Sequence, residues 1–159
     1  MLKNFEIQTR NLSIDDIGPV YKLGYSIFDW PTERVLWNEQ IVRWYYEQSQ
    51  AICFVTEKDS GIIGFILCFA TQSLGRVEWV AVDRMFQKQG VATELLRHAL
   101  LVFKLNKITH ISTLAREDGK ANTFFIQNGF QNSGLRKTEM SLNTQNFSKG
   151  IKQSSSANP

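Results

Sequence analysis

The stretch with the clearest chemical potential is a polar loop between an apolar run and the start of a helix. Residues 80–82 (Val-Ala-Val) have the character of a buried strand end, and Gly90 is followed by small residues that open a helix. The first backbone N–H groups of such a helix have no partners inside it and point outward. The helix dipole adds partial positive charge there, so the loop is suited to a phosphate group. Gly90 lets a ligand approach the backbone closely, and Ala92 keeps the next contact small.

Seven consecutive residues form this predicted phosphate-binding loop: Gln87, Lys88, Gln89, Gly90, Val91, Ala92 and Thr93. Within it, Lys88 contributes long-range attraction and Thr93 a hydroxyl donor. The dinucleotide fingerprint G-x-G-x-x-G and the P-loop G-x-x-x-x-G-K-[ST] are both absent. A phosphate-binding protein of another fold therefore stays open as an alternative.

Two motifs in this sequence resemble those of one enzyme family. Gln87-x-x-Gly90-x-Ala92 fits the pattern [Q/R]-x-x-G-x-[G/A] and resembles the coenzyme A pyrophosphate loop of the GNAT superfamily of acetyl-CoA-dependent N-acetyltransferases. Residues 121–130 (Ala-Asn-Thr-Phe-Phe-Ile-Gln-Asn-Gly-Phe) are similar to the closing motif of that family, A-x-x-x-[Y/F]-x-x-x-G-F. The order of the predicted elements matches the family over about residues 5–142.

The resemblance implies how the rest of the cofactor is held. In the family, the fourth strand separates from the fifth at a bulge, and the pantetheine arm of the cofactor lies in the gap. Carried over, the backbone of Val80 and Val82 would bond the thioester carbonyl and the pantetheine amides, with Ala81 in the same contact segment. A bulge leaves peptide groups without partners, which a ligand can satisfy. The motif places Asn122 and Phe125 beside the cofactor as well.

The activity that the resemblance implies is transfer of the acetyl group of acetyl-CoA to a primary amine. The amine belongs to a small molecule, a peptide or a protein, and attacks directly in a ternary complex. Acetyl-CoA is the co-substrate and no metal is implied. Neither nucleic acid nor membrane is expected as a partner, and a homodimer stays open.

A carboxylate that accepts the proton of the amine is predicted at Glu78. Strand alternation puts Arg76, Glu78 and Val80 on one face, where Glu78 can act directly or through water. Glu78 is equally well explained as a polar residue of a partly hydrated strand, or as the partner of an arginine. The choice between these roles is left open here.

Phe125 departs from the family pattern, because many members have a tyrosine there that protonates the leaving thiolate. A phenylalanine cannot donate a proton, so we expect it only to pack against pantetheine. Water, or a hydroxyl such as that of Thr113 or Tyr21, would then supply the proton. The missing tyrosine also keeps a second function open, a non-catalytic sensor of acyl-CoA on the same fold.

The acceptor site is expected between the two amino-terminal helices, their connecting loop and the last hairpin. Aromatic and acidic side chains crowd this region, and a few acidic groups beside exposed aromatics would suit a cationic amine. Aromatic residues at helical spacing are more often part of the core, which is the competing interpretation. The residues concerned are Asp29, Trp30, Glu33, Trp37, Trp44, Tyr45 and Tyr46.

The elements that must position these residues follow from apolar periodicity. The predicted order is β-α-α-β-β-β-α-β-α-β-β, an α/β protein whose mixed sheet has helices on both faces. A turn is expected at Leu74-Gly75, and the sequence of residues 58–61 predicts a hairpin. The predicted strands are 5–10, 51–56, 62–70, 77–82, 108–114, a segment from 130 and 137–142. The predicted helices start after Ser13 and cover 38–49, 90–105 and 120–128, with a loop at 28–32.

Composition bounds the remaining possibilities. With 159 residues and 43% hydrophobic content, the chain suits one folded domain, predicted over residues 1–143, with a polar, mobile tail over 144–159. The net charge of +3 is spread along the chain and is too weak to indicate nucleic acid. The amino end has no apolar run of signal-peptide length, so a cytoplasmic location is expected. Cys53 and Cys68 lie in apolar runs, which predicts buried, reduced thiols without zinc-site spacing.

Overall fold

The computed structural model describes residues 6–29, 31–115, 119–133 and 139–143. Its helices and strands follow the predicted order, with one helix added. In chain order they are β1 (Gln8–Asn11), η1 (Ile14–Asp16), α1 (Ile17–Ile27), α2 (Pro31–Leu36), α3 (Glu39–Glu47), β2 (Ala51–Lys58), β3 (Gly61–Ala70), β4 (Leu74–Val82), η2 (Arg84–Phe86), α4 (Val91–Leu105), β5 (His110–Leu114), α5 (Lys120–Gln127), β6 (Gln131–Asn132) and β7 (Glu139–Asn143).

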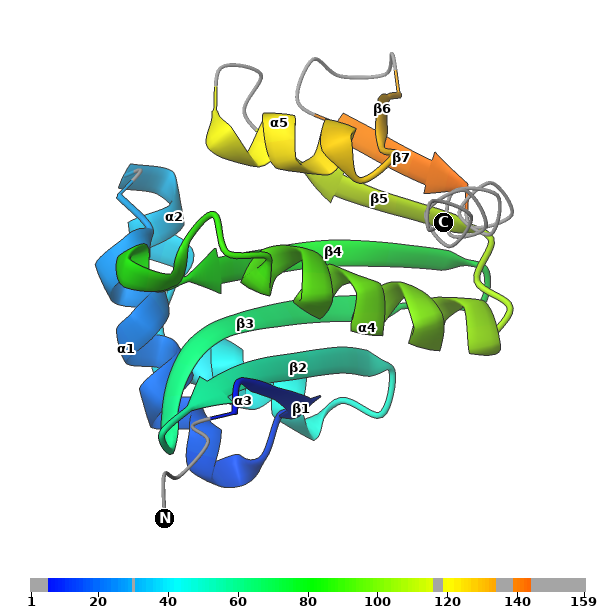
Figure 1. The fold of residues 1–159 in the computed structure, drawn as a ribbon. Coiled ribbons are helices and arrows are strands. Elements are labelled where there is room, and N and C mark those ends of the chain that lie inside the picture. The colour runs from blue at the N-terminus through cyan, green and yellow to red at the C-terminus, as the bar shows by residue number, and fades with distance from the viewer. Residues whose placement is uncertain (1–5, 30, 116–118, 134–138, 144–159) are drawn as a thin grey trace, which may run out of the picture.

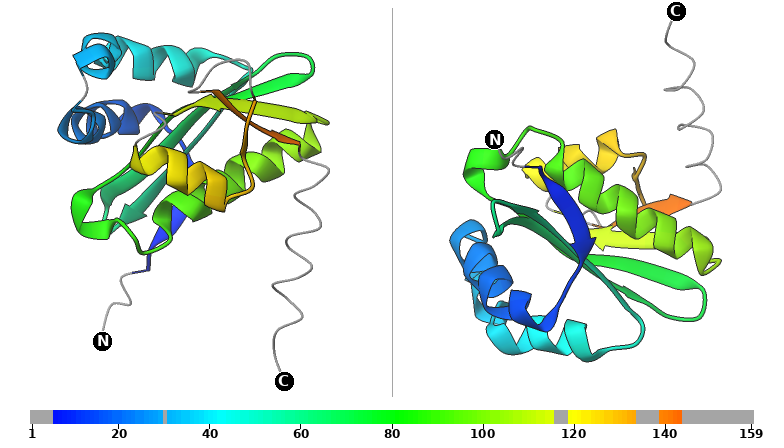
Figure 2. Two further views of the ribbon diagram at one scale, coloured as in Figure 1. Left: turned by 90° about the horizontal axis from the view of Figure 1, so that it is seen from above. Right: turned by 60° about the horizontal axis from the view of Figure 1, so that its bottom comes forward.

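The strands form one mixed sheet in the order β1-β2-β3-β4-β5-β7-β6. Neighbouring strands are antiparallel except β4 and β5, which are parallel. Helices α1 and α3 pack on one face of the sheet, and α4 and α5 lie on the other (Figures 1 and 2). The predicted α/β class with helices on both faces is therefore confirmed.

Each face of the sheet has its own apolar core. One core lies between the sheet and helices α4 and α5, and we call it the α4 core. The other lies between the sheet and helices α1 and α3, and we call it the α1 core. Val91, Leu95 and Ala99 of the predicted inner stripe of α4 are buried, whereas Val102 is only partly buried. The two cores hold the helices against the two faces of the sheet.

The hairpin between β2 and β3 has the predicted turn. Asp59 and Ser60 both have positive φ, 53° and 67°. Two successive residues of that kind make the type I′ turn, whose twist matches that of the strands on either side. The turn therefore fixes the register of the two long central strands.

Gly75 was expected in a turn, but it lies inside strand β4. A Cβ atom built on Gly75 would meet Cε1 of Phe103 at 2.5 Å. Because the aromatic ring of α4 occupies the space of a side chain, position 75 needs glycine for packing. The turn prediction at Leu74-Gly75 is wrong for this reason.

The loop predicted at residues 28–32 is also partly wrong, because helix α2 begins at Pro31. Proline suits the first helical position, where its missing N–H costs little. Val35 and Leu36 of this helix are exposed, at 80% and 53%. The two apolar side chains described in this helix therefore give no buried stripe from which periodicity could identify it.

Several predicted boundaries are shifted by a few residues. Strand β1 begins at Gln8 and not at residue 5, and β5 begins at His110 and not at 108. Helix α3 ends at Glu47, and Asn38 is its N-cap because its side chain accepts from the amide of Ile41 at 2.9 Å. The predicted tail at 144–159 lies outside the described residues.

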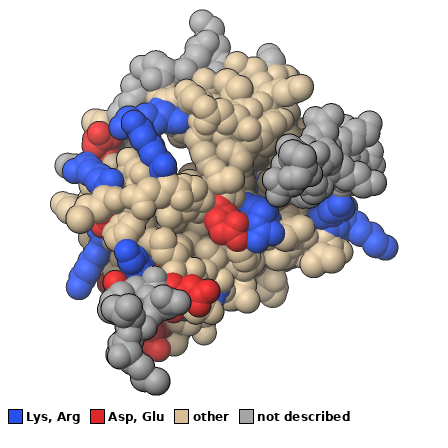
Figure 3. Space-filling model, viewed as in Figure 1, with Lys and Arg blue, Asp and Glu red and all other residues tan. Residues whose placement is uncertain are grey.

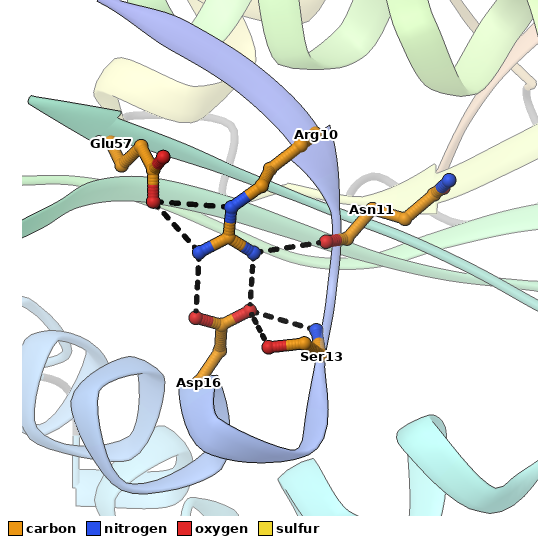
Figure 4. Close-up of polar contacts among 5 residues, drawn as sticks. All are labelled: Arg10, Asn11, Ser13, Asp16 and Glu57. Atoms are coloured by element: carbon orange, nitrogen blue, oxygen red, sulfur yellow. Dashed lines mark hydrogen bonds and ion pairs between the residues drawn. The ribbon is translucent and has the colours of Figure 1, made fainter. Parts of the chain in front are cut away.

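A partly buried ion-pair cluster joins β1, β2 and the helical layer (Figure 4). The Arg10 guanidinium donates to both carboxylate oxygens of Asp16, at 2.7 and 3.0 Å, and to Glu57 at 2.8 Å. The backbone N–H of Ser13 donates to Asp16 at 2.7 Å. Burial opposes ionisation of Asp16, but the hydrogen bonds from Arg10 and Ser13 outweigh it and lower the pKa of that carboxyl. Asp16 is therefore a charged group at the amino end of α1.

Candidate active site

The sheet opens between β4 and β5. Strand β5 pairs with β4 only over four rungs, from Leu74 with His110 to Val77 with Thr113. Beyond Val77, β4 continues to Val82 and pairs with β3 alone. Among the residues that the structure describes, a stretch of this central strand therefore has one edge without a neighbouring strand.

The hydrogen-bond pattern tells which backbone groups face this open edge. The amide of Asp83 donates to the carbonyl of Ile63 on β3 at 2.8 Å. Because backbone groups alternate in direction along a strand, Val80 and Val82 point their N–H and C=O groups away from β3. Ala81 points its backbone toward β3. Of the three residues predicted to contact the cofactor here, Val80 and Val82 reach the open edge through their backbone and Ala81 does not.

A β-bulge sits where the two strands separate. Leu67 of β3 pairs with Trp79, and the next residue, Cys68, pairs with Val77, so Glu78 is the extra residue. Trp79 packs in the α1 core, whereas Val80 packs in the α4 core. The bulge therefore breaks the strand parity on which the placement of Glu78 and Val80 on one face depended. That prediction is wrong for Val80.

Arg76 and Glu78 do share a face. Nε of Arg76 lies 2.7 Å from Oε1 of Glu78, and the two side chains are 46% and 30% exposed. The arginine partner that was one of the alternatives for Glu78 is thus present. The ion pair engages one carboxylate oxygen, which leaves Oε2 for another contact.

The loop between β4 and α4 is held by its own side chains. Asp83 caps the short helix η2 by accepting from the amide of Met85 at 2.8 Å. Gln87 donates from Nε2 to the carbonyl of Val82 at 2.9 Å. The side chain of Gln87 therefore fastens the loop to the end of β4. The sequence motif did not indicate this bond or the cap at Asp83.

Gly90 has φ +84° and forms the N-cap of α4. This is the left-handed region, which favours glycine. A Cβ atom on Gly90 would meet nothing within 4 Å, so the space in front of it is open. The first intrahelical bond is from the amide of Glu94 to the carbonyl of Gly90, at 3.0 Å. The amides of Val91, Ala92 and Thr93 thus have no partner within the helix, and this arrangement fits an anionic phosphate.

The surface around this loop is hollowed and basic. In the space-filling view a hollow lies between α5 and the start of α4, with Lys and Arg side chains beside it (Figure 3). Arg84 and Lys88 of the loop segment and Lys120 at the start of α5 are exposed. Of these three residues, only Lys88 lies in the loop predicted from the sequence. Their positive charge near the start of α4 and α5 would attract a phosphorylated ligand.

Helix α5 contributes packing to the candidate site. Phe125 is 2% exposed and lies in the α4 core, with its ring centroid 5.0 Å from those of Phe124 and Phe130. Asn122 is partly buried on the same helix. Gly129 follows the helix with φ +89°, as expected for a glycine that ends a helix.

The two hydroxyls considered as proton donors differ in their surroundings. The Thr113 hydroxyl is buried at the last rung between β4 and β5 and donates to the carbonyl of Val77 at 3.0 Å. Its proton is therefore used within the sheet. Tyr21 lies on α1 and is partly buried. Its backbone carbonyl, rather than its hydroxyl, accepts from the Trp37 indole at 2.9 Å.

The aromatic residues expected at the acceptor site divide into core and surface. Trp37 and Tyr45 are buried, and Trp37 stacks on Phe65 at 5.3 Å. Burial and the nearby charge of Glu78 raise the pKa of Tyr45, so its hydroxyl stays protonated. Trp44 and Tyr46 are exposed. Asp29 is exposed as well, whereas Trp30 and the side chain of Glu33 lie outside the described residues.

The two cysteines are free thiols. Cys68 is buried and Cys53 partly buried, and burial raises the pKa of Cys53 to about 12. Over the ranges that the structure describes, three or more His, Cys, Asp or Glu side chains do not gather at any point as a metal site. Those same ranges contain no helix with the length and apolar content to cross a membrane.

Comparison with known proteins shows the family to which the chain belongs. Residues 49–132, more than half of the chain, match the family model described as "Acetyltransferase (GNAT) domain". The chain belongs to the GNAT acetyltransferase family. No curated protein sequence matches it.

Solved structures of this fold resemble the chain over most of its length. PaiA N-acetyltransferase from Thermoplasma acidophilum, in complex with coenzyme A, has a TM-score of 0.75 at 16% identity, covering 87% of this chain and 99% of that one. Ard1 from Thermoplasma volcanium has a TM-score of 0.72 at 18% identity, covering 86% and 97%. The ribosomal-protein-S18-alanine N-acetyltransferase from Escherichia coli has a TM-score of 0.71 at 15% identity, covering 87% and 94%. At these identities the likeness establishes the GNAT fold.

Proposed function

We propose that this protein transfers the acetyl group of acetyl-CoA to a primary amine by direct attack in a ternary complex. The observation that carries the proposal is the continuity between the open edge of β4 and the start of α4. The backbone groups of Val80 and Val82 that face away from β3 precede a short loop, and that loop ends at the amides of residues 91–93. Such a line of donors and acceptors, ending at an anion site, suits an extended amide-containing chain with a pyrophosphate at one end.

The residues present fit this cofactor in chemistry as well as in order. Gly90 leaves open space where a phosphate would approach the helix. The peptide groups of Val80 and the N–H of Val82 can take up the amides of a pantetheine arm, while the Val82 carbonyl already accepts from Gln87. When bound, acetyl-CoA supplies a thioester carbonyl that an amine can attack.

Only a neutral amine can attack that carbonyl. A lysine side chain with a pKa near 10.4 is neutral about once in 2,500 molecules at pH 7, and an α-amine with a pKa near 7.8 about once in seven. We therefore assign Glu78 the role of accepting the proton of the amine through Oε2, directly or by way of water. The N–C bond forms, the C–S bond breaks, and the thiolate takes a proton from solvent because Phe125 has none to give.

The lack of a hydroxyl at Phe125 favours a second candidate function, a sensor that binds acyl-CoA without turnover. Phe125 is enclosed in the α4 core, so the side chain serves packing.

Two further parts of the proposal, the extent of the domain and the location of the protein, rest on the sequence as well. Residues 1–143 would form one domain, since the sheet extends from Gln8 to Asn143, and we place the protein in the cytoplasm.

A thiol-release assay separates the two functions. The purified protein is incubated with acetyl-CoA and a panel of small amines, amino acids and amino-terminal peptides. Acetyl transfer predicts thiol release that requires both protein and a particular amine. Thermal stabilisation by acetyl-CoA without release from any amine would support the sensor, and neither effect would contradict both functions.

A further inference from the structure

Arg76 has unused binding capacity beside the proposed proton acceptor. A guanidinium has five N–H donors in a planar fork, and the ion pair with Glu78 is made from Nε. No second ion pair or hydrogen bond of Arg76 is found among the residues that the structure describes. The side chain is 46% exposed, so its two terminal nitrogens can reach a ligand. This edge of a guanidinium binds a carboxylate through two parallel hydrogen bonds.

The two opposite charges stand at the mouth of the opening in the sheet. Arg76 pairs with Ser112 one rung before the β4–β5 ladder ends, and Glu78 is the bulged residue directly after the last rung. Nε of Arg76 and Oε1 of Glu78 are 2.7 Å apart. A ligand that satisfies both groups therefore needs a cation and an anion only a few bonds apart.

An apolar surface adjoins this pair on the same face. Arg76 lies opposite Phe69 on β3, and the ring of Trp44 lies 5.5 Å from that of Phe69. Trp44 is 44% exposed. An apolar side chain on the ligand would find a contact here without crossing the charged pair.

We propose that the acceptor is a free amino acid, whose carboxylate binds the terminal nitrogens of Arg76 while its amine faces Glu78. This proposal rests on the proposed acetyl transfer and names the substrate class of the same site. An amino acid brings its two charges together as the pair requires. A lysine side chain or the amino terminus of a peptide has no carboxylate near its amine, so either would leave the terminal nitrogens of Arg76 without a ligand contact.

The reaction keeps the carboxylate unchanged. The nitrogen of the amino acid forms the new N–C bond, the C–S bond of the thioester breaks, and the amine proton passes through Glu78 to solvent. The product has lost its positive charge and keeps its negative one. It can therefore bind Arg76 but no longer satisfies Glu78, which favours release.

The test compares each amino acid with its own amide. Leucine and leucinamide, phenylalanine and phenylalaninamide, and glycine and glycinamide are assayed at equal concentrations of neutral amine, with acetyl-CoA saturating. We expect kcat/KM for the acid to exceed that for the amide by roughly 10- to 100-fold, the range of a charge-assisted hydrogen-bonded pair. Arg76→Gln should abolish this preference, and Arg76→Lys should restore it only in part because lysine lacks the fork.

The acid-to-amide ratio isolates direct contact from indirect effects. An effect of Arg76 on Glu78 alone would lower both rates together and leave the ratio unchanged. Arg97 supplies the matched control, since it is also 46% exposed and paired with a glutamate, on α4. Arg97→Gln should leave the ratio as in the wild type.

Two results would overturn the proposal while acetyl transfer stands. One is that amides, peptides or simple amines are acetylated as well as the acids. The other is that Arg76→Gln preserves the preference for the acid. Absence of thiol release with every amine would instead count against the proposed function itself.

Discussion

At the scale of single residues, Gly90 has the sharpest requirement. Its φ of +84° and the empty space in front of it both belong to the proposed phosphate site. A larger residue at this position would be strained by about 1–2 kcal/mol and would project into the path of the ligand. The two effects can be separated by comparing stability with binding.

We expect Gly90→Leu to fold but to lose the thermal stabilisation that acetyl-CoA gives to the wild type. At 100 times Kd that stabilisation is about 2.7 kcal/mol, readily measured in a thermal shift experiment. Gly129→Ala is the matched control, because Gly129 also has positive φ, +89°, but lies at the end of α5. The control should melt earlier without ligand yet keep its gain with ligand. An undiminished gain in Gly90→Leu would show that the loop does not hold the pyrophosphate.

Glu78 is expected to matter most when the amine is charged. Glu78→Gln should lower kcat/KM by about 100-fold at pH 7 for an amine with a pKa near 10. The loss should shrink as the pH rises, because solvent then supplies the neutral amine. For an α-amine with a pKa near 7.8 the loss should be small throughout. A pH–rate profile of the variant measures this.

Acetyl-CoA affinity should be unchanged in Glu78→Gln, because the proposed cofactor contacts are backbone groups of Val80, Val82 and the loop. A loss of rate that is the same at every pH, or a parallel loss of cofactor affinity, would give Glu78 a structural role instead.

At the scale of elements, the bulge of β4 accounts for what alternation could not predict. Arg76 and Glu78 fall on one face as expected, but the extra residue turns Val80 to the other. A bulge has no residue type of its own, so it cannot be seen in the local sequence. Gly75 was misplaced for a related reason, since glycine is frequent in turns and only the ring of Phe103 explains it within a strand.

The parts that could be predicted have strong local causes. The stripe of α4, the turn at Asp59 and Ser60, and the glycine loop at Gly90 each depend on periodicity or on backbone conformation that few residues accept. Whether two side chains of one strand pair with each other depends on their rotamers and on the bulge at Glu78, and the ion pair of Arg76 with Glu78 could therefore be raised only as an alternative.

The packing of α1 against Trp37 gives a prediction for an element. A Cβ atom on Gly24 would lie 2.4 Å from the Trp37 ring, whereas one on Gly18 of the same helix would meet nothing within 4 Å. Gly24→Ala should lower the free energy of unfolding by about 1–3 kcal/mol, since the buried ring must move. Gly18→Ala should leave it unchanged or raise it by up to about 1 kcal/mol. Urea denaturation compares them, and equal stabilities would contradict the close packing of α1.

At the scale of the whole molecule, the cluster around Arg10 ties the edge of the sheet to the helical layer. Asp16 has a pKa below its ordinary value in the folded protein. Its contribution to stability is therefore fully present above the unfolded-state pKa of about 3.9 and is lost as the pH falls through the folded-state value. We expect stability to decline in this acidic range.

Asp16→Asn should remove that part of the pH dependence and lower stability at pH 7 by about 3 kcal/mol, since Arg10 and the buried site lose their charged partner. Asp15→Asn is the control, because Asp15 is exposed and adjacent. Unfolding free energies measured between pH 3 and 7 decide the matter. Parallel curves for the wild type and Asp16→Asn would contradict the ionised state of Asp16.

The central claim is that the open backbone edge of β4 and the amides at the start of α4 bind acetyl-CoA together. Titration of isotope-labelled protein with acetyl-CoA, followed by amide NMR, tests it residue by residue. We predict that the amide signals of Val80, Val82 and residues 90–93 shift strongly, and that of Ala81 much less, because its N–H points to β3. Binding that shifts signals elsewhere and leaves Val80, Val82 and the loop unchanged would contradict the account.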